Sequence, residues 1–505
     1  MSADFKKITK NTGFLYIRLI LVMGVTLYTS RIVLEVLGAT NYGLYYAIFS
    51  IIGLLSFLTG TLSAGTSRFI TYEIGTGNSN KLKTTFSTAL YSHALLGFII
   101  IILGETIGLW YAYNVLVVPD GSQGVALIVY QISIISTVIS IIQIPFVADI
   151  IAHERMNAFA YIGIYEAVAK LVVLYFLVET SANKLLIFAF LQLLVAISVF
   201  FLYFIYSFTQ FKEVTVKKIF DKYIFKEILK FSGWNIIANI SETLMSQGII
   251  MLYNIFFMPF VVAAQAIANQ ISRTMMQFVN NVRQAVNPQV IKLYADNNHR
   301  ESQRLTFISA EYVFYLLLIL GVPCIVVMPM ILNIWLTNVP DYTVAFARLI
   351  IAQQILGNFS SAFYTPMLAA NKLAKNSIAS VFLCIFQFLV LWLLFKIGFG
   401  PLWARYLGLF SAVCFSFIVK PYILWKDVNY NLKEIGSTIL KCMKVLAEII
   451  FITGLTYISI KQTNIYFSIL CGTLTFIETL FVCVINIKKT HRKKLILFIR
   501  KKLKI

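Results

Sequence analysis

Two rows of polar side chains recur at helical spacing inside otherwise apolar stretches of the sequence. The first row is Asn235, Asn239, Glu242 and Ser246, and the second is Asn269, Arg273, Gln277, Asn280 and Gln284. Each row lies on one face of a helix, because positions three, four and seven residues apart share a face. Amides exchange hydrogen bonds with hydroxyl groups, and guanidinium groups bind phosphate through paired donors. The two rows therefore predict a hydrated surface suited to an anionic, polyhydroxylated molecule.

Other polar residues inside apolar stretches leave two interpretations open. One row consists of Ser133, Ser136, Ser140 and Gln143. Such residues commonly form hydrogen bonds between helices in membrane bundles, so this row favours a packing role. Lys170 follows Glu166 by one helical turn, so the two charges form either a structural pair or part of a binding site. Arg18 and Arg31 lie near the ends of their stretch, where an arginine commonly extends towards lipid headgroups.

The candidate binding residues are the polar and cationic side chains expected well inside apolar stretches, together with the two arginines near the N-terminus. They are Arg18, Arg31, Lys170, Asn235, Asn239, Glu242, Asn269, Arg273, Gln277, Asn280, Gln354 and Asn358. The six cysteines include no CxxC pair, and the four histidines are scattered along the chain. The sequence therefore predicts no catalytic residue, no metal ligand and no cofactor.

The composition indicates that these residues belong to membrane-spanning helices. Of the 505 residues, 59% are hydrophobic and only 12% are charged, whereas soluble domains are about a quarter charged. This excludes a water-soluble multi-domain protein, a disordered chain and a disulfide scaffold. Runs long enough to cross a bilayer predict about fourteen transmembrane helices. Their approximate limits are 13–36, 43–67, 86–109, 124–147, 158–178, 185–206, 232–257, 263–287, 306–330, 343–368, 377–396, 402–424, 438–459 and 466–487.

The distribution of Lys and Arg predicts the orientation of these helices. With the N-terminus in the cytoplasm, 29 of the 42 basic residues fall in inside loops and tails and three in outside loops. Since basic residues concentrate in cytoplasmic loops, both termini are expected to be cytoplasmic. The excess of basic over acidic residues then indicates contact with anionic lipid headgroups, without nucleic acid as a partner.

The connecting segments are too short for a catalytic domain. No outside loop exceeds about fifteen residues, and the chain lacks the GxxxxGK[ST] motif of nucleotide hydrolases. These features disfavour a glycan-transfer enzyme with a large outside loop and exclude ATP hydrolysis by the chain itself.

An internal repeat predicts the domain organisation. The segment 8–13 resembles 228–233, the segment 82–89 resembles 305–310, and Pro145 corresponds to Pro366, all at an offset of about 220 residues. Six helices per copy give both copies the same orientation. We expect two parallel six-helix lobes around a central cleft and two extra C-terminal helices. The lobes would be 1–206 and 232–425, with a basic cytoplasmic linker at 207–231 and the last two helices and a basic tail at 426–505.

Several short motifs resemble those of one membrane-protein family. They are Ser30–Arg31, Leu37–Gly38, Asn41–Tyr45, Arg68–Phe69, Phe231–Trp234 and Asn287–Pro288. With these motifs and fourteen expected helices, the whole chain resembles the polysaccharide (O-antigen type) lipid flippases of the multidrug/oligosaccharidyl-lipid/polysaccharide exporter superfamily. Asn41 stands where this group usually has an acidic residue.

The resemblance implies translocation without bond chemistry. It implies that an undecaprenyl-diphosphate-linked oligosaccharide crosses the bacterial cytoplasmic membrane by alternating access, for surface polysaccharide such as lipopolysaccharide. The pyrophosphate and sugars would meet Arg18, Arg31, Arg273 and nearby amides, and proton or sodium coupling stays open. Membrane lipids and glycan-assembly proteins would be partners. The alternative is a drug or small-cation antiporter of the MATE type on the same fold, for which Glu242 would be the essential carboxylate.

Overall fold

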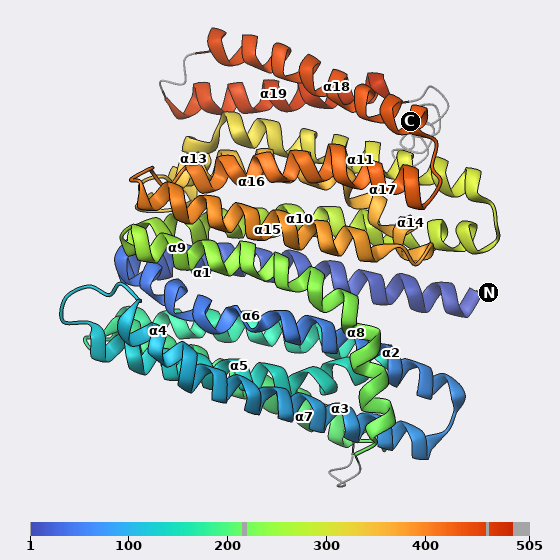
Figure 1. The fold of residues 1–505 in the computed structure, drawn as a ribbon. Helices are drawn as coiled ribbons and strands as arrows, with labels where there is room; N and C mark the ends of the chain where they lie inside the picture. The colour runs from blue at the N-terminus through green and yellow to red at the C-terminus, as the bar shows by residue number, and fades with distance from the viewer. Residues whose placement is uncertain (1, 215–219, 461–463, 488–505) are drawn as a thin grey trace. The chain divides into compact units, whose positions relative to one another are not determined.

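The computed structural model describes residues 2–214, 220–460 and 464–487, and within these ranges it contains helices and loops but no strand (Figure 1). The predicted all-α class is therefore confirmed for the described part of the chain. The chain divides into two compact units. Unit 1 comprises 1–266, 335–341 and 380–401, and unit 2 comprises 267–334, 342–379 and 402–505.

Unit 1 contains the first nine α-helices and most of α15. The bounds are α1 Ser2–Gly53, α2 Ser56–Thr76, α3 Ser79–Leu103, η1 Gly104–Gly108, α4 Leu109–Asn114, α5 Gln123–Ala152, α6 Met156–Glu179, α7 Lys184–Gln210, α8 Lys222–Thr243, η2 Leu244–Gly248, α9 Ile249–Phe256 and α15 Leu373–Lys396. Within this unit α1 packs on α6, and α5 packs on α3 and α7.

Unit 2 contains most of α10 and the remaining helices. The bounds are α10 Pro259–Ala295, α11 His299–Val326, α12 Met328–Trp335, α13 Thr343–Asn358, η3 Phe359–Phe363, α14 Tyr364–Ala369, α16 Trp403–Cys414, η4 Phe415–Val419, α17 Lys420–Asp427, α18 Leu432–Ser459 and α19 Ile465–Asn486. Here α11 packs on α13, α18 and α19. The lobe boundaries expected from the repeat stay a prediction.

The described helices group into fourteen segments that correspond to the fourteen predicted spans. Gly38 separates the first two, because its φ of 72° and ψ of 164° break the helical path of α1. A positive φ of this kind favours glycine. The seventh and eighth segments are divided by a tight turn, since α9 ends at Phe256 and α10 begins at Pro259.

The ends of the helices differ from the predicted limits because caps set them, not hydropathy. The third segment was expected to begin near residue 86, but α3 begins at Ser79, where the Asn78 side chain accepts a hydrogen bond from the Lys81 N–H at 3.0 Å. The preceding helix α2 ends at Thr76, and its C-cap residue Gly77 has a φ of 69°. A helix begins where a side chain caps its first backbone N–H groups, and it often ends before a glycine with positive φ. Here these points lie outside the apolar run.

Nine of the described helices are long and apolar enough to cross a membrane. Helix α10 is not among them, although it has 37 residues. Its row of amides and Arg273 lowers its mean hydropathy, as expected for a helix that turns a polar face to protein or water.

A π-helical turn fixes α5 against α3. The turn η1 spans Gly104–Gly108, and the hydroxyl of Tyr130 on α5 donates to the Gly104 carbonyl at 2.6 Å. A Cβ on Gly108 would lie 2.2 Å from the Tyr130 oxygen, so glycine is required there. π-turns leave carbonyl groups without their usual helical partner, and this one serves as the acceptor that holds α5 in place.

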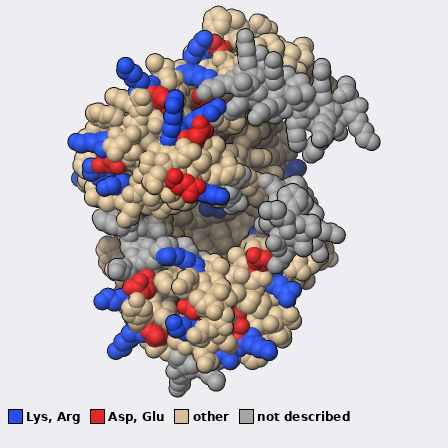
Figure 2. Space-filling model, turned by 90° about the vertical axis from the view of Figure 1, so that its right-hand side faces the viewer, with Lys and Arg blue, Asp and Glu red and all other residues tan. Residues whose placement is uncertain are grey.

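Charged side chains are frequent on the surface that Figure 2 draws. Lys and Arg side chains are interspersed there with Asp and Glu side chains. The first turns of α3 and α11, which follow connections that the sequence predicts to be cytoplasmic, carry the basic residues Lys81 and Arg300.

Gly43 gives a direct test of the packing in unit 1. A Cβ added there would lie 1.8 Å from the carbonyl oxygen of Pro259, so the backbone at the start of α10 would have to move. We expect Gly43→Ala to destabilise the protein by about 1–3 kcal/mol, as overpacking generally does. Thermal unfolding in detergent measures the effect.

The matched control is Gly24→Ala on the same helix, where an added Cβ meets nothing within 4 Å. Equal unfolding temperatures for the two variants would contradict the close approach of Gly43 to Pro259.

Candidate functional site

A polar cavity lies within unit 1, between α1, α5, α6 and α7. Its volume is about 220 Å³. It is lined by Tyr45, Phe49, Ser136, Ser140, Gln143, Glu166, Lys170, Gln192, Val195, Ala196 and Val199. Seven of these side chains carry hydroxyl, amide or charged groups that can bind a polar molecule, and the rings of Tyr45 and Phe49 come from α1.

The serine row of α5 is divided between the cavity and the core. Ser133 is fully buried, and its hydroxyl donates to the Tyr130 carbonyl at 2.6 Å. Ser140 is exposed and donates to the Ser136 carbonyl at 2.9 Å. Both hydroxyls therefore donate within α5 and not to a neighbouring helix, as serine hydroxyls in helices often do. The oxygen lone pairs of Ser140 remain able to accept from a ligand.

A charged pair on α6 faces the same cavity. Lys170 Nζ lies 2.6 Å from Glu166 Oε1, and the two side chains are 38% and 37% exposed. The pair expected from their spacing is present, and it also lines the cavity. The ammonium group of Lys170 has three N–H donors. One bonds Glu166, and the others are available to a ligand in the cavity.

Arg18 lies against the same face of α6, towards the start of that helix. Its guanidinium carbon is 4.1 Å from the centre of the Phe159 ring, and a Cβ on Gly163 would lie 2.1 Å from its Nε. Phe159, Gly163 and Glu166 share one helical face. Among the described residues, no group accepts a hydrogen bond from the buried Nε of Arg18. Arg18 thus packs into the protein one helical turn from the charged pair.

The polar residues of α13 and α14 connect helices within unit 2. Gln354 donates to the Ser272 hydroxyl of α10 at 2.5 Å, and Asn358 donates to the Gln354 side-chain oxygen at 2.6 Å. Further along, Thr365 donates to the Asn287 side-chain oxygen at 2.8 Å. These groups have partners in the protein, so this row serves packing between α10 and its neighbours.

The remaining predicted residues are distributed along α1, α8 and α10. Half-buried side chains are Arg31, Asn239, Asn269 and Gln277, and exposed ones are Glu242, Arg273 and Asn280. The side chain of Asn235 lies outside the described residues. The structure thus brings together Lys170 with Glu166 and Gln354 with Asn358.

Sequence reasoning missed two groups. Gln192 lines the cavity from α7 but is a single polar residue in an apolar run, so it forms no row. Asp149, His153 and Glu213 gather at the end of α5, with ligand atoms within 4.8 Å of one another. Two of these are i and i+4 neighbours, but Glu213 is 60 residues further on, and no spacing in the sequence indicated it.

Solved structures show what the fold is similar to. An inward-facing multidrug resistance MATE family transporter of the MOP superfamily matches with a TM-score of 0.61 and 16% identity, over 86% of this chain and 98% of that one. The lipid II flippase MurJ in an inward closed conformation matches with a TM-score of 0.65 and 14% identity, over 92% and 97%. No family model matches the sequence, and the search of curated proteins finds no match.

These likenesses show the fold alone, since the identities are low. The chain has the all-helical fold of the MATE and MurJ transporters over nearly its whole length. With nine described helices able to cross a bilayer, it is a multi-pass membrane protein.

Gln354 has a packing role and Gln192 lines the cavity, and measurements of stability distinguish these two roles. We expect Gln354→Leu to destabilise the protein by about 1–3 kcal/mol, because Asn358 and Ser272 would lose partly buried hydrogen bonds. Gln192→Leu has no such bond to break among the described residues and should leave the unfolding temperature nearly unchanged. If Gln354→Leu unfolds at the same temperature as Gln192→Leu, the packing role of Gln354 is wrong.

Proposed function

We propose that this protein is a flippase that moves an undecaprenyl-diphosphate-linked oligosaccharide across the bacterial cytoplasmic membrane by alternating access. The observation that carries the proposal is the polar cavity of unit 1, where Lys170 lies among hydroxyl and amide groups. Cations bind the diphosphate, and Ser, Gln and Tyr groups exchange hydrogen bonds with sugar hydroxyls. The fold shared with a lipid II flippase supports this class of cargo.

The volume of the cavity limits which part of the cargo it can bind. Sites for drug-sized ligands measure roughly 300–1,000 Å³, so a cavity of about 220 Å³ receives only part of a lipid-linked oligosaccharide. We assign it to the sugar or phosphate nearest the lipid. Arg18, one turn along α6, extends the positive charge beside it, and Arg31 and Arg273 contact the cargo at other stages of its passage. The lipid tail stays in the bilayer.

The protein acts as a transporter and not as an enzyme in this proposal. Both termini lie in the cytoplasm, the cargo enters from the inner leaflet, and glycan-assembly proteins supply and receive it. The cargo is part of surface polysaccharide assembly of the O-antigen type. Proton or sodium antiport provides the energy in this proposal.

The alternative function is export of a drug or small cation. Glu242 on α8 favours it, because its side chain is exposed and no described residue forms an ion pair with it. The fold shared with multidrug transporters is compatible with this function. The cavity of unit 1 favours the flippase, since its one carboxylate, Glu166, is paired with Lys170.

Surface glycan in the native host tests the proposal. We expect Lys170→Ala and Arg273→Ala to reduce glycan export by roughly tenfold or more, because a charge-assisted hydrogen bond contributes about 1.5–3 kcal/mol. Export is measured as lectin binding to intact cells, and the amount of protein in the membrane is measured in parallel.

The controls remove the same charges elsewhere. Lys81→Ala at the start of α3 and Arg300→Ala at the start of α11 alter exposed residues outside the cavity and should leave export unchanged. Normal export by both Lys170→Ala and Arg273→Ala at normal protein levels would refute the flippase assignment.

Dye efflux distinguishes the alternative. A flippase should export no cationic dye from cells that overproduce the wild-type chain. An antiporter should do so, and Glu242→Gln should abolish that efflux because the amide cannot bind or release a proton at this position. Glu154→Gln, an exposed acid in the turn after α5, is the control. Dye efflux that depends on Glu242 would contradict the flippase proposal and support the antiporter.

A further inference from the structure

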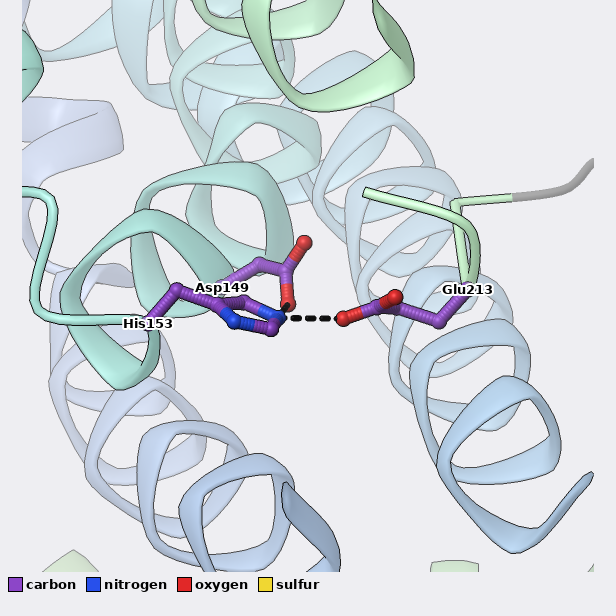
Figure 3. A group of neighbouring side chains, drawn as sticks. All are labelled: Asp149, His153 and Glu213. Carbon is purple, nitrogen blue, oxygen red and sulfur yellow. Dashed lines mark hydrogen bonds and ion pairs between the residues drawn. The ribbon is translucent and has the colours of Figure 1, made fainter. Parts of the chain in front are cut away.

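Three side chains with metal-binding chemistry converge at the end of α5, outside the cavity. Asp149 lies in the last turn of α5, His153 follows that helix directly, and Glu213 belongs to the segment after α7 (Figure 3). All three belong to unit 1. The sequence predicts this end of α5 and the segment after α7 to face the cytoplasm, so ions of the cytoplasm reach them.

The local structure holds the imidazole in one orientation. The His153 N–H donates to the Asp149 carbonyl at 3.0 Å, which continues the helical turn and places the two side chains on one face. The imidazole stacks on the Phe211 ring with 4.2 Å between ring centres and 9° between planes. Phe211 precedes Glu213 by two residues, and both are buried. This stack therefore positions the carboxylate of Glu213 together with the imidazole.

The imidazole cannot serve both carboxylates. His153 Nε2 bonds Oε1 of Glu213, and Oδ1 of Asp149 lies 3.8 Å from the same nitrogen, too far for a hydrogen bond. Asp149 is fully buried, and among the described residues neither of its carboxylate oxygens accepts a hydrogen bond. A buried carboxylate without a partner is costly. The imidazole at 3.8 Å is the one basic group that the structure places within ion-pair distance of Asp149 among the described residues, and Glu213 already holds it.

A divalent metal ion can bind both carboxylates at once, whereas the N–H group of the imidazole bonds only Glu213. It accepts electron pairs from Nε2 and from both carboxylates at once, and its two positive charges balance Asp149 and Glu213 beside a neutral imidazole. Ligand atoms about 2.1 Å from one ion lie up to about 4.2 Å apart. The observed atoms lie within 4.8 Å of one another, so small side-chain rotations complete the set.

We propose that Asp149, His153 and Glu213 bind a divalent transition-metal ion, with water completing the coordination. One nitrogen and two carboxylate oxygens suit Zn²⁺ or Mn²⁺ better than Ca²⁺ or Mg²⁺, which prefer oxygen ligands alone. The ion ties the end of α5 to the segment that leads from α7 to α8. The His153 side chain is 26% exposed, so the ion has a path from solvent. The site is independent of the flippase proposal.

Metal content of the purified full-length chain tests the site. The protein carries no polyhistidine tag, is stripped with a chelator in detergent, and is then dialysed against Zn²⁺. We expect one tightly held Zn²⁺ per chain by elemental analysis, and a higher unfolding temperature with Zn²⁺, because a ligand that binds only the folded state stabilises it. Asp149→Asn and Glu213→Gln should each weaken binding by about a hundredfold or more, and Glu154→Gln should match the wild type.

Asp149→Asn also separates the metal site from a simple protonated carboxyl. Asn has the shape of a neutral Asp, so it would preserve a site in which Asp149 only carries a proton. Wild-type protein that holds no Zn²⁺, or Asp149→Asn protein that holds as much as the wild type, would overturn the proposal. If the variants do not fold, the wild type alone decides the question by Co²⁺ titration. Binding of one equivalent of Co²⁺ that excess Zn²⁺ displaces, measured by elemental analysis after dialysis, supports the site, and its absence refutes it.

Discussion

Polar groups inside membrane-spanning helices must find partners in the protein or in water, because hydrocarbon offers none. This chain has only 12% charged residues, and many of its polar side chains lie within apolar helices. The structure satisfies them in different ways. The α13 row bonds to α10, the hydroxyls of Ser133 and Ser140 bond within α5, and Lys170 bonds to Glu166. Other side chains with bonding capacity left over line the cavity of unit 1.

The distinction between packing and binding follows from the remaining capacity of each group. The Gln354 side chain donates to Ser272, and the Asn358 side chain donates to Gln354, so these groups serve packing between helices. Ser140, Gln192 and Lys170 line a cavity and keep donors or acceptors that no hydrogen bond among the described residues uses. The same residue types therefore have opposite roles, and the partner of each group decides which role it has.

The number and approximate positions of the helices could be predicted from the sequence, since apolar runs of bilayer length and the breaks at Gly38 and Pro259 are local features. The charged pair on α6 was also predictable from its i, i+4 spacing. The assembly of the cavity was not, because it depends on which faces of α1, α5, α6 and α7 meet. The serine row was expected to join helices, yet its hydroxyls bond to their own backbone. Asp149 and Glu213 are brought together only by the fold of the segment after α7.

The account requires the cavity of unit 1 to be filled with water in the membrane. Ser140 lines it, whereas Ile135 on the same helix is exposed on another face, 48% accessible and expected to contact acyl chains. In a chain whose six native cysteines are replaced, each position is changed to cysteine and labelled in membranes with a hydrophilic maleimide. Thiols react as thiolates, which need water. The account predicts rapid labelling of Ser140→Cys and negligible labelling of Ile135→Cys, and equally slow labelling at both positions would contradict it.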